Sequence, residues 1–422
     1  MGIKEARFSI SALNKYMPDR IAKRVTGGVL FVAFLSMVTL VAKSPNRFIY
    51  DERYFVTYVS LLHQDGFTPR FLNSLEAAPG PLSAVVQVTF EPLTRLQPVA
   101  MRFVNVSLLI VLALVLAMWL KREGSDYWVA GCSVLMVPMA WVVGGMALTE
   151  MSAMVFVTLS LYLQLRGLEA SDANRPVLAW FLAAGICLGI AVWGRQPYLL
   201  LSGVPVLVAL AHPRLRVAAA IFVGAAVGLA IPLFVIWRGF VAPSQHLLPG
   251  FSLVHGLLSF CYAGICFFLL GARSRWLSVK AVVGLVVLAI VANAFWGAFV
   301  FYPLRLLVER FLPPSVIPAY INLAGPLFLS CGVLSLAVLL RMIWESRNDL
   351  RRLTVNAGLL CVTAAPFLDT HLYSSRYTAM TLPYLILAAQ PWRQWRLETV
   401  MGAALGCGLG FLSLYGYFAF GH

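Results

Sequence analysis

Long apolar runs follow one another along almost the whole chain, and they restrict the fold more than any other feature. A helix needs about 20 apolar residues to cross a membrane, and about 13 runs approach that length. Only 12% of the 422 residues are charged, against about 25% in a soluble domain. The sequence therefore predicts an all-α, polytopic integral membrane protein. The predicted spans are 25–43, 100–120, 127–146, 148–166, 176–193, 196–211, 215–237, 251–271, 278–300, 321–344, 353–368, 377–390 and 397–419.

The basic residues predict how the chain is oriented in the membrane. If the N-terminus is cytoplasmic and the spans alternate, about two thirds of all Lys and Arg fall on the cytoplasmic side, as the positive-inside rule requires. The net charge of +15 is then an orientation signal rather than a nucleic-acid footprint. We expect a basic cytoplasmic segment at 1–24 and one transmembrane domain at 25–422, which includes a long first outer loop at 44–99.

Several common kinds of site are not indicated. The seven cysteines all lie in apolar runs and none has C-x-x-C spacing, which is typical of buried structural residues rather than of disulfides or zinc sites. The sequence also lacks a phosphate-binding P-loop, an H-E-x-x-H helix and a G-x-S-x-G elbow, which argues against ATP-driven transport and zinc proteolysis.

Two adjacent carboxylates, Asp51 and Glu52, follow the first span closely and are flanked by Tyr50 and Tyr54. Neighbours on a helix differ by about 100° in direction, so one carboxylate can face a cavity while the other makes structural contacts. The aromatic residues suit the membrane interface, and a carboxylate beside apolar walls can accept a proton from an alcohol. The alternative is an ordinary solvated acidic pair.

The rest of the first outer loop predicts two helices that lie on the membrane. Apolar residues recur at helical spacing over 55–62, and Gly66 ends that segment. A turn at Pro79-Gly80-Pro81 then opens a second apolar segment, 82–96, which is too short to span comfortably. These helices could cradle a lipid-borne substrate or simply cover the end of the bundle.

Arg195 and Gln196 lie in a break between two apolar runs on the expected outer side, and Glu150 lies near the outer end of its span. A charge at membrane depth is costly, so it usually has a partner or a function. The forked guanidinium suits a phosphate group, and Glu150 is a candidate partner. A purely structural ion pair is the alternative.

A third polar cluster runs from Asp369 through His371 and Tyr373 to Arg376. Its groups could bind phosphate or sugar hydroxyls, or form a hydrated loop. His371 has no second ligand at helical spacing, so we expect no metal site and no cofactor, although a divalent metal is not excluded.

The Asp-Glu pair and the interfacial helices resemble membrane glycosyltransferases of the GT-C type, which use polyprenyl-phosphate sugars. Three stretches look most like the dolichyl-phosphate-glucose α-1,2-glucosyltransferase family. They are Tyr50-Asp51-Glu52-Arg53-Tyr54-Phe55, Pro79-Gly80-Pro81-Leu82 and Arg195-Gln196-Pro197. The sequence departs from that family at three places. Val56 stands where the family has a histidine, Ser83 and Ala84 stand where it has an aromatic residue, and Pro197 stands where it has a threonine.

The resemblance implies a role for each cluster. Asp51 would be the general base on the acceptor hydroxyl, and Glu52 would orient it or serve as the alternative base. Arg195 and Arg376 would hold the leaving phosphate with help from His371. Tyr50, Tyr54, Glu150, Gln196, Asp369 and Tyr373 would surround them or contact substrate.

The expected partners are a polyprenyl-phosphate-sugar donor, membrane lipid and an envelope acceptor such as a lipid-linked glycan, with no nucleic acid. The preference for Arg over Lys suggests a GC-rich bacterium, hence an inner-membrane protein with a periplasmic site; the endoplasmic reticulum is the alternative. A transporter or lipid-linked-glycan flippase is the main alternative function, and a non-catalytic scaffold or polymer ligase is another. The sugar and the acceptor stay open.

Overall fold

We describe the protein from a computed structural model. It describes residues 19–76, 79–122, 126–245, 250–271, 279–296, 308–309, 312–369, 373–391 and 396–421. Most of the expected cytoplasmic segment 1–24, and His371, lie outside these residues. Within the described ranges every regular element is a helix, in agreement with the predicted all-α class.

Six helices are long and apolar enough to cross a membrane, and four shorter apolar helices lie among them. The chain is therefore a polytopic membrane protein, as predicted. The long helices are α2 (Asp19–Ala42), α6 (Pro98–Arg122), α9 (Glu150–Asp172), α12 (Arg216–Trp237), α16 (Ile317–Glu345) and α20 (Leu397–Phe420). The shorter ones are α10 (Leu178–Gly194), the segment Gln196–Ala211 that ends in α11 (Gly203–Ala211), α13 (Leu253–Leu269) and α14 (Val279–Trp296).

Each predicted span coincides with a helical segment, but several are not continuous spans, so the number of crossings is not fixed at thirteen. The expected span 127–146 is split into Tyr127–Met136 and Pro138–Gly145, which meet at 86°. Proline cannot donate the backbone hydrogen bond that would continue the first helix, and Pro138 starts the second piece, α8 (Pro138–Gly145).

The expected spans 353–368 and 377–390 are also divided. The first holds α17 (Leu350–Ala364) followed by a 3-10 turn, Ala365–Leu368. The second holds only α18 (Arg376–Ala379) and α19 (Leu382–Ala389). Pro366 and Pro383 each lie at the start of the later piece, where a proline is tolerated but the preceding helix ends.

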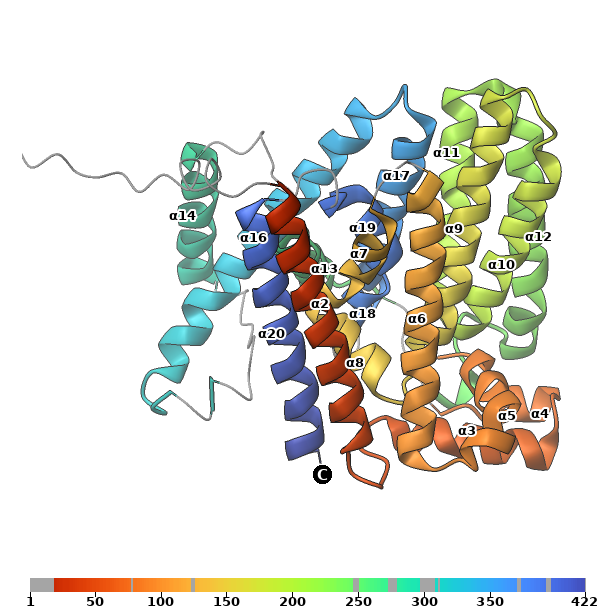
Figure 1. Cartoon of the computed structure of the whole chain (residues 1–422), viewed down its shortest axis with the longest axis horizontal. Coiled ribbons are helices and arrows are strands. Elements are labelled where there is room, and N and C mark those ends of the chain that lie inside the picture. Colours follow the sequence, from red (N-terminus) through yellow and green to blue (C-terminus); the bar gives the residue numbers. More distant parts are fainter. Residues whose placement is uncertain are drawn as a thin grey trace, which may run out of the picture.

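Small residues let the central helices approach closely, which is how helices associate in a lipid environment that offers little hydrophobic drive. On α10, a Cβ at Gly185 would overlap the carbonyl oxygen of Phe222 on α12. On α20, a Cβ at Gly406 would overlap the carbonyl oxygen of Met136. Helices α9, α10 and α12 thus form one packed group at the right of Figure 1, while α2 and α20 lie side by side at its centre.

The loop 44–99, which we expect on the outer side, folds into short helices across one end of the bundle, at the bottom of Figure 1. They are α3 (Glu52–Asp65), α4 (Pro69–Asn73) and α5 (Leu82–Thr94). Both expected interfacial helices are therefore present, and Gly66, with φ of 62°, ends the first. Trp237 Nε1 donates to the Leu72 carbonyl at 2.8 Å, and this bond ties α4 to α12.

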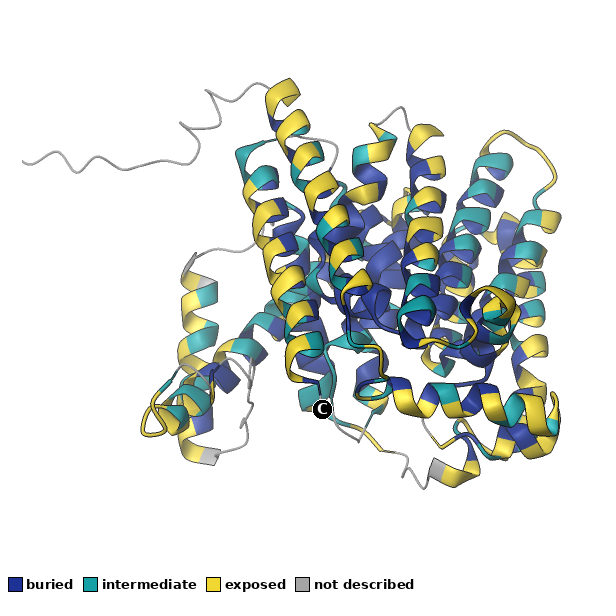
Figure 2. Cartoon of the chain, turned by 60° about the horizontal axis from the view of Figure 1, so that its bottom comes forward, coloured by how far each residue is buried: buried dark blue, intermediate teal, exposed yellow. Residues whose placement is uncertain are grey.

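These loop helices are amphipathic. On α3, Phe55, Tyr58 and Val59 are buried against the bundle, whereas Tyr54 is 51% exposed. Figure 2 shows the same alternation of buried and exposed bands along the loop helices, in contrast to the buried interior behind them. This end of the bundle therefore has a folded cover, and its inner face borders the residues described next.

Candidate active site

Asp51 and Arg376 form an ion pair that joins the first outer loop to a segment 325 residues later. Tyr50 has a left-handed φ of 46°, and this turn leads into Asp51, which caps the start of α3. Arg376 opens α18, and its Nε donates to Ser374 Oγ at 3.1 Å. The Asp51 carboxylate keeps 40% of its surface exposed and the Arg376 side chain 20%. This pair is therefore open to a ligand on one side.

Glu52 has the opposite environment, because its side chain is completely buried. Arg102 Nε donates to Glu52 Oε1 at 2.9 Å and Arg102 Nη2 to Oε2 at 2.7 Å, a bidentate pair. The backbone amides of Ala147 and Ile49 donate to the same carboxylate at 2.8 and 3.0 Å. Glu52 thus fixes the start of α3 to α6 and to the turn before α9.

Arg102 completes this buried network. Its Nη1 donates to Ser44 Oγ at 2.8 Å and to the Pro45 carbonyl at 2.6 Å, and its Nη2 donates to the Arg47 carbonyl at 2.7 Å. The turn between α2 and α3 is therefore wrapped around one guanidinium. We did not single out Arg102 from the sequence, although a lone charge at the start of an apolar run was a signal that it had a partner.

Arg195 and Glu150 form a second buried ion pair, as the sequence suggested. Arg195 follows the end of α10 in an extended conformation, and Glu150 lies in the first turn of α9. Arg195 Nε and Glu150 Oε2 are both buried without a hydrogen-bond partner. Buried polar atoms are usually satisfied, so these two atoms keep unused hydrogen-bonding capacity inside the site.

The two ion pairs influence one another through their charges. Burial of Arg376 lowers its pKa, but the charges of Glu150 and Asp51 and the hydrogen bond to Asp51 outweigh burial and raise it. Glu150 therefore acts on both arginines, since it also bonds Arg195. The site thus holds two guanidiniums and two carboxylates, and Arg376 stays a cation at any physiological pH.

Aromatic and polar residues from the third cluster pack along the segment that carries Arg376. Tyr373 hydrogen-bonds Thr378 across their hydroxyls at 2.9 Å, and burial raises the pKa of the Tyr373 phenol, so it stays neutral. His255 Nδ1 bonds the Asp369 carbonyl at 2.6 Å, and its ring lies 5.7 Å from that of Tyr373. His255 was also missed in the sequence, where it sits in an apolar run without a motif.

The remaining candidates are less closely involved. Tyr50 packs edge-on against Tyr417 of α20, with ring centroids 5.2 Å apart. Gln196 is partly buried beside Arg195, at the start of a 3-10 turn. Tyr54 is exposed on the outside of α3. In the part of the chain that the structure describes, no three His, Cys, Asp or Glu side chains form a group that could hold a metal.

Comparison with protein families gives one match. Residues 72–241 match the family described as dolichyl-phosphate-mannose-protein mannosyltransferase. The match covers less than half of the chain; it includes Arg102, Glu150 and Arg195 but neither Asp51 nor Arg376. A comparison with curated proteins found no match.

Two crystal structures of ArnT from Cupriavidus metallidurans are among the solved structures that resemble the chain. The apo structure has 18% sequence identity and a TM-score of 0.46, and the similarity covers 93% of this chain and 76% of that one. The structure bound to undecaprenyl phosphate has 16% identity and a TM-score of 0.43, and the similarity covers 93% and 77% of the two chains.

Proposed function

We propose that this protein is a membrane glycosyltransferase of the GT-C type, which moves a sugar from a polyprenyl-phosphate donor to an acceptor hydroxyl. The observation that carries the proposal is the open ion pair between Asp51 and Arg376, beside the buried pair of Arg195 and Glu150. A carboxylate that can receive a proton thus lies next to cations that can receive a phosphate.

The donor phosphate would bind between Arg376 and Arg195. Guanidinium forks suit phosphate oxygens, and the unpaired Nε of Arg195 is one donor available for such a contact. The description of the family that matches residues 72–241 names dolichyl-phosphate-mannose, a lipid-phosphate sugar. This match supports a lipid-phosphate sugar as the donor. His371 keeps its expected assisting role in this proposal.

Asp51 would act as the general base in a single displacement with inversion. The acceptor hydroxyl gives its proton to Asp51 while its oxygen forms the new bond to the anomeric carbon. The bond from that carbon to the phosphate oxygen breaks through an oxocarbenium-like state, and the polyprenyl phosphate leaves as an anion held by the arginines. The leaving group needs no proton, because cations stabilise its charge.

The ion pair of Asp51 and Arg376 would make the donor bind before the acceptor reacts. While Arg376 donates to Asp51, that carboxylate oxygen is occupied and is not available to an acceptor hydroxyl. A donor phosphate would compete for Arg376 and release Asp51 toward the acceptor. The base would then be free only when a sugar is in place, so the acceptor would react after the donor binds.

The test is a transfer assay with purified protein and radiolabelled polyprenyl-phosphate sugars. We expect Asp51→Asn to reduce transfer by about 10²–10⁴-fold, the usual contribution of a general base, while the protein still reaches the membrane. The matched control is Glu91→Gln, which removes an acid from α5 that bonds His63 at the edge of the loop cover. Full transfer by Asp51→Asn would exclude Asp51 as the base.

The same assay addresses the sugar and the alternative function. Glucose is tested first because of the α-1,2-glucosyltransferase likeness, then mannose, then a pentose. Transfer without ATP or an ion gradient supports the glycosyltransferase. Uptake or flipping of a labelled lipid that depends on ATP or a gradient, without transfer, would support a transporter instead. An inner-membrane location with a periplasmic site, and an acceptor in the cell envelope, complete the proposal.

A further inference from the structure

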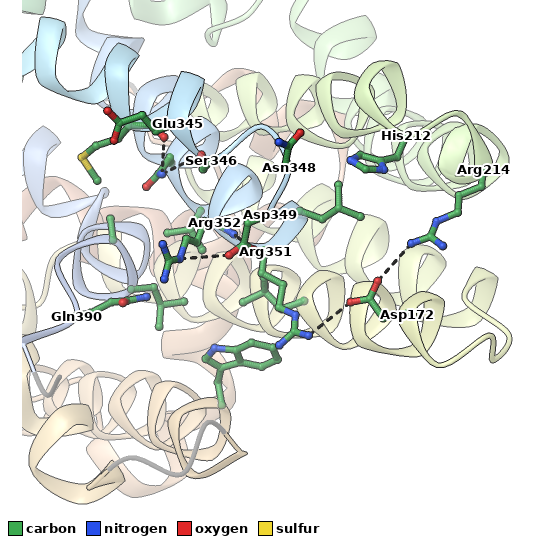
Figure 3. Close-up of a pocket in the computed structure, with 18 residues that line it drawn as sticks. Asp172, His212, Arg214, Glu345, Ser346, Asn348, Asp349, Arg351, Arg352 and Gln390 are labelled. Atoms are coloured by element: carbon green, nitrogen blue, oxygen red, sulfur yellow. Dashed lines mark hydrogen bonds and ion pairs between the residues drawn. The ribbon is translucent and has the colours of Figure 1, made fainter.

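A pocket of about 760 Å³, drawn in Figure 3, has Asp172 among its lining residues, and Asp172 lies at the opposite end of α9 from Glu150 of the candidate active site. Helix α9 connects the two, because Glu150 begins it and Asp172 ends it. The 23 residues of that helix put the two ends about 33 Å apart at 1.5 Å per residue. The pocket is therefore separate from the proposed glycosyltransferase chemistry, and nothing in the proposed reaction uses it.

Two arginines in this pocket share one carboxylate. Arg214 Nη2 lies 3.3 Å from Asp172 Oδ1, and Arg351 Nη2 lies 3.5 Å from Asp172 Oδ2. Figure 3 shows both guanidiniums directed at Asp172 from different segments. Arg352 has its own partner, Asp349, at 3.2 Å. Glu345, the third acid of the lining, pairs with Arg341 at 2.9 Å, so Asp172 balances one of the two charges of Arg214 and Arg351.

The shared contacts leave these arginines accessible to a ligand. Both distances exceed the 2.7–2.9 Å that is usual for charged hydrogen bonds, and each guanidinium has five N–H donors. The side chains of Arg214, Arg351 and Asp172 are 54%, 42% and 45% exposed. An anion with several oxygens could bridge the two forks without a buried charge being left unpaired.

The rim of the pocket has features of a membrane-water boundary. Trp344, one residue before the pocket-lining Glu345, is 68% exposed. The Arg347 guanidinium lies 4.6 Å from the centroid of its ring. Exposed tryptophan and arginine at helix ends are typical of the level of lipid headgroups. This end also carries the loops expected to face the cytoplasm, where anionic lipids attract basic residues.

We propose that the pocket binds the phosphate diester headgroup of an anionic phospholipid through Arg214 and Arg351. The lipid phosphate would lie between the two guanidiniums, in competition with Asp172, and its acyl chains would follow the apolar helices into the membrane. Because Arg214 precedes α12 and Arg351 lies in α17, the headgroup would join these two segments in place of Asp172, the last residue of α9.

Native mass spectrometry of the whole detergent-purified protein tests this proposal. The probes are dioleoylphosphatidylglycerol, dioleoylphosphatidylcholine and inorganic phosphate. We expect phosphatidylglycerol to bind in preference to phosphatidylcholine. The double variant Arg214→Gln/Arg351→Gln should weaken phosphatidylglycerol roughly thirtyfold, at about fivefold per arginine. The charge-matched control, Arg20→Gln/Arg175→Gln, removes two exposed arginines that do not line the pocket and should have little effect.

A second variant with the opposite expected effect distinguishes a loss of lipid binding from a loss of folding. Asp172→Asn removes the competing carboxylate and should tighten phosphatidylglycerol, with a higher Tm in its presence. Equal losses in the double variant and its control would overturn the proposal, as would Asp172→Asn that leaves binding unchanged or weaker. Displacement of the lipid by millimolar inorganic phosphate would show that the ligand is a soluble phosphate compound and not a lipid.

Discussion

Asp51 and Glu52 are neighbours in the chain, each is paired with an arginine, and yet their environments are opposite. Glu52 is fully buried and accepts from Arg102 and from two backbone amides. Asp51 is 40% exposed and accepts from Arg376. A buried charge pair is costly to break because one partner is left uncompensated, whereas an exposed pair contributes little to stability. The first is therefore suited to hold the loop, and the second can exchange its partner for a substrate.

The largest effect should come from the buried ion pair of Glu52 and Arg102. Arg102→Met leaves the Glu52 carboxylate buried without its cation, which costs about 3–5 kcal/mol. We expect a strongly lowered Tm and little protein in the membrane, measured by thermal unfolding in detergent and by quantitative blotting. The double variant Arg102→Met/Glu52→Gln removes both charges and should recover part of the loss. An Arg102→Met protein as stable as the wild type would contradict the structural role of this pair.

Substitutions in the partly exposed ion pair of Asp51 and Arg376 should change activity rather than stability. Arg376→Lys keeps the charge but loses the fork, which holds both Asp51 and Ser374. Hydrogen bonds to charged groups contribute about 1.5–3 kcal/mol, so we expect kcat/KM for the lipid-phosphate donor to fall roughly 10–100-fold. Tm should change little. A large fall in Tm with normal kcat/KM would reverse the distinction between the two pairs.

A smaller effect is expected at the residue that orients Arg376. Ser374→Ala removes the oxygen that accepts from Arg376 Nε at 3.1 Å. A hydrogen bond to a charged group contributes about 1.5–3 kcal/mol, and because Ser374 orients Arg376 without contacting the donor, we expect only the lower end of that range, a fall in transfer of about tenfold, mainly through KM for the donor. The control Ser107→Ala alters a hydroxyl that bonds only the carbonyl of its own helix. Equal losses in both variants would remove Ser374 from the site.

The smallest effect is the change in stability caused by Asp51→Asn. The partly exposed ion pair of Asp51 with Arg376 should contribute no more than about 1 kcal/mol to the free energy of unfolding, because solvent screens it. Thermal unfolding should therefore separate Asp51→Asn, stable but inactive, from Glu52→Gln, which disturbs the buried network. If the two variants unfold at the same temperature, the comparison between the carboxylates fails.

Much of the architecture was predictable from the sequence. The apolar runs located the helical segments, and Gly66 and Pro81 marked the limits of the loop helices, because these signals are local. A proline is a known signal for a helix break, so the breaks near Pro138, Pro366 and Pro383 could have been expected. A hydropathy pattern alone predicts continuous spans at these three places. Whether a proline kinks a helix or divides it depends on what packs against the freed carbonyls.

The site was predictable as a set of residue types, but not as a set of pairs. The Asp51–Glu52 pair, Arg195 and Arg376 stood out because charges are rare in this chain, and Glu150 was a natural candidate for Arg195. No local signal connects Glu52 with Arg102, 50 residues later. His255 carries no motif at all, and its contacts with the Asp369 carbonyl and the Tyr373 ring are visible only in the tertiary structure.

The sequence by itself determined that this chain is helical and membrane-embedded, because the cost of unsatisfied backbone groups in lipid leaves few other solutions for so many apolar runs. It also selected the few charges that need a partner or a function. Only the tertiary structure decided which of two adjacent carboxylates is closed in the protein and which stays open. Burial and partner choice depend on contacts between segments as distant as Asp51 and Arg376, and local pattern carries no information about those contacts.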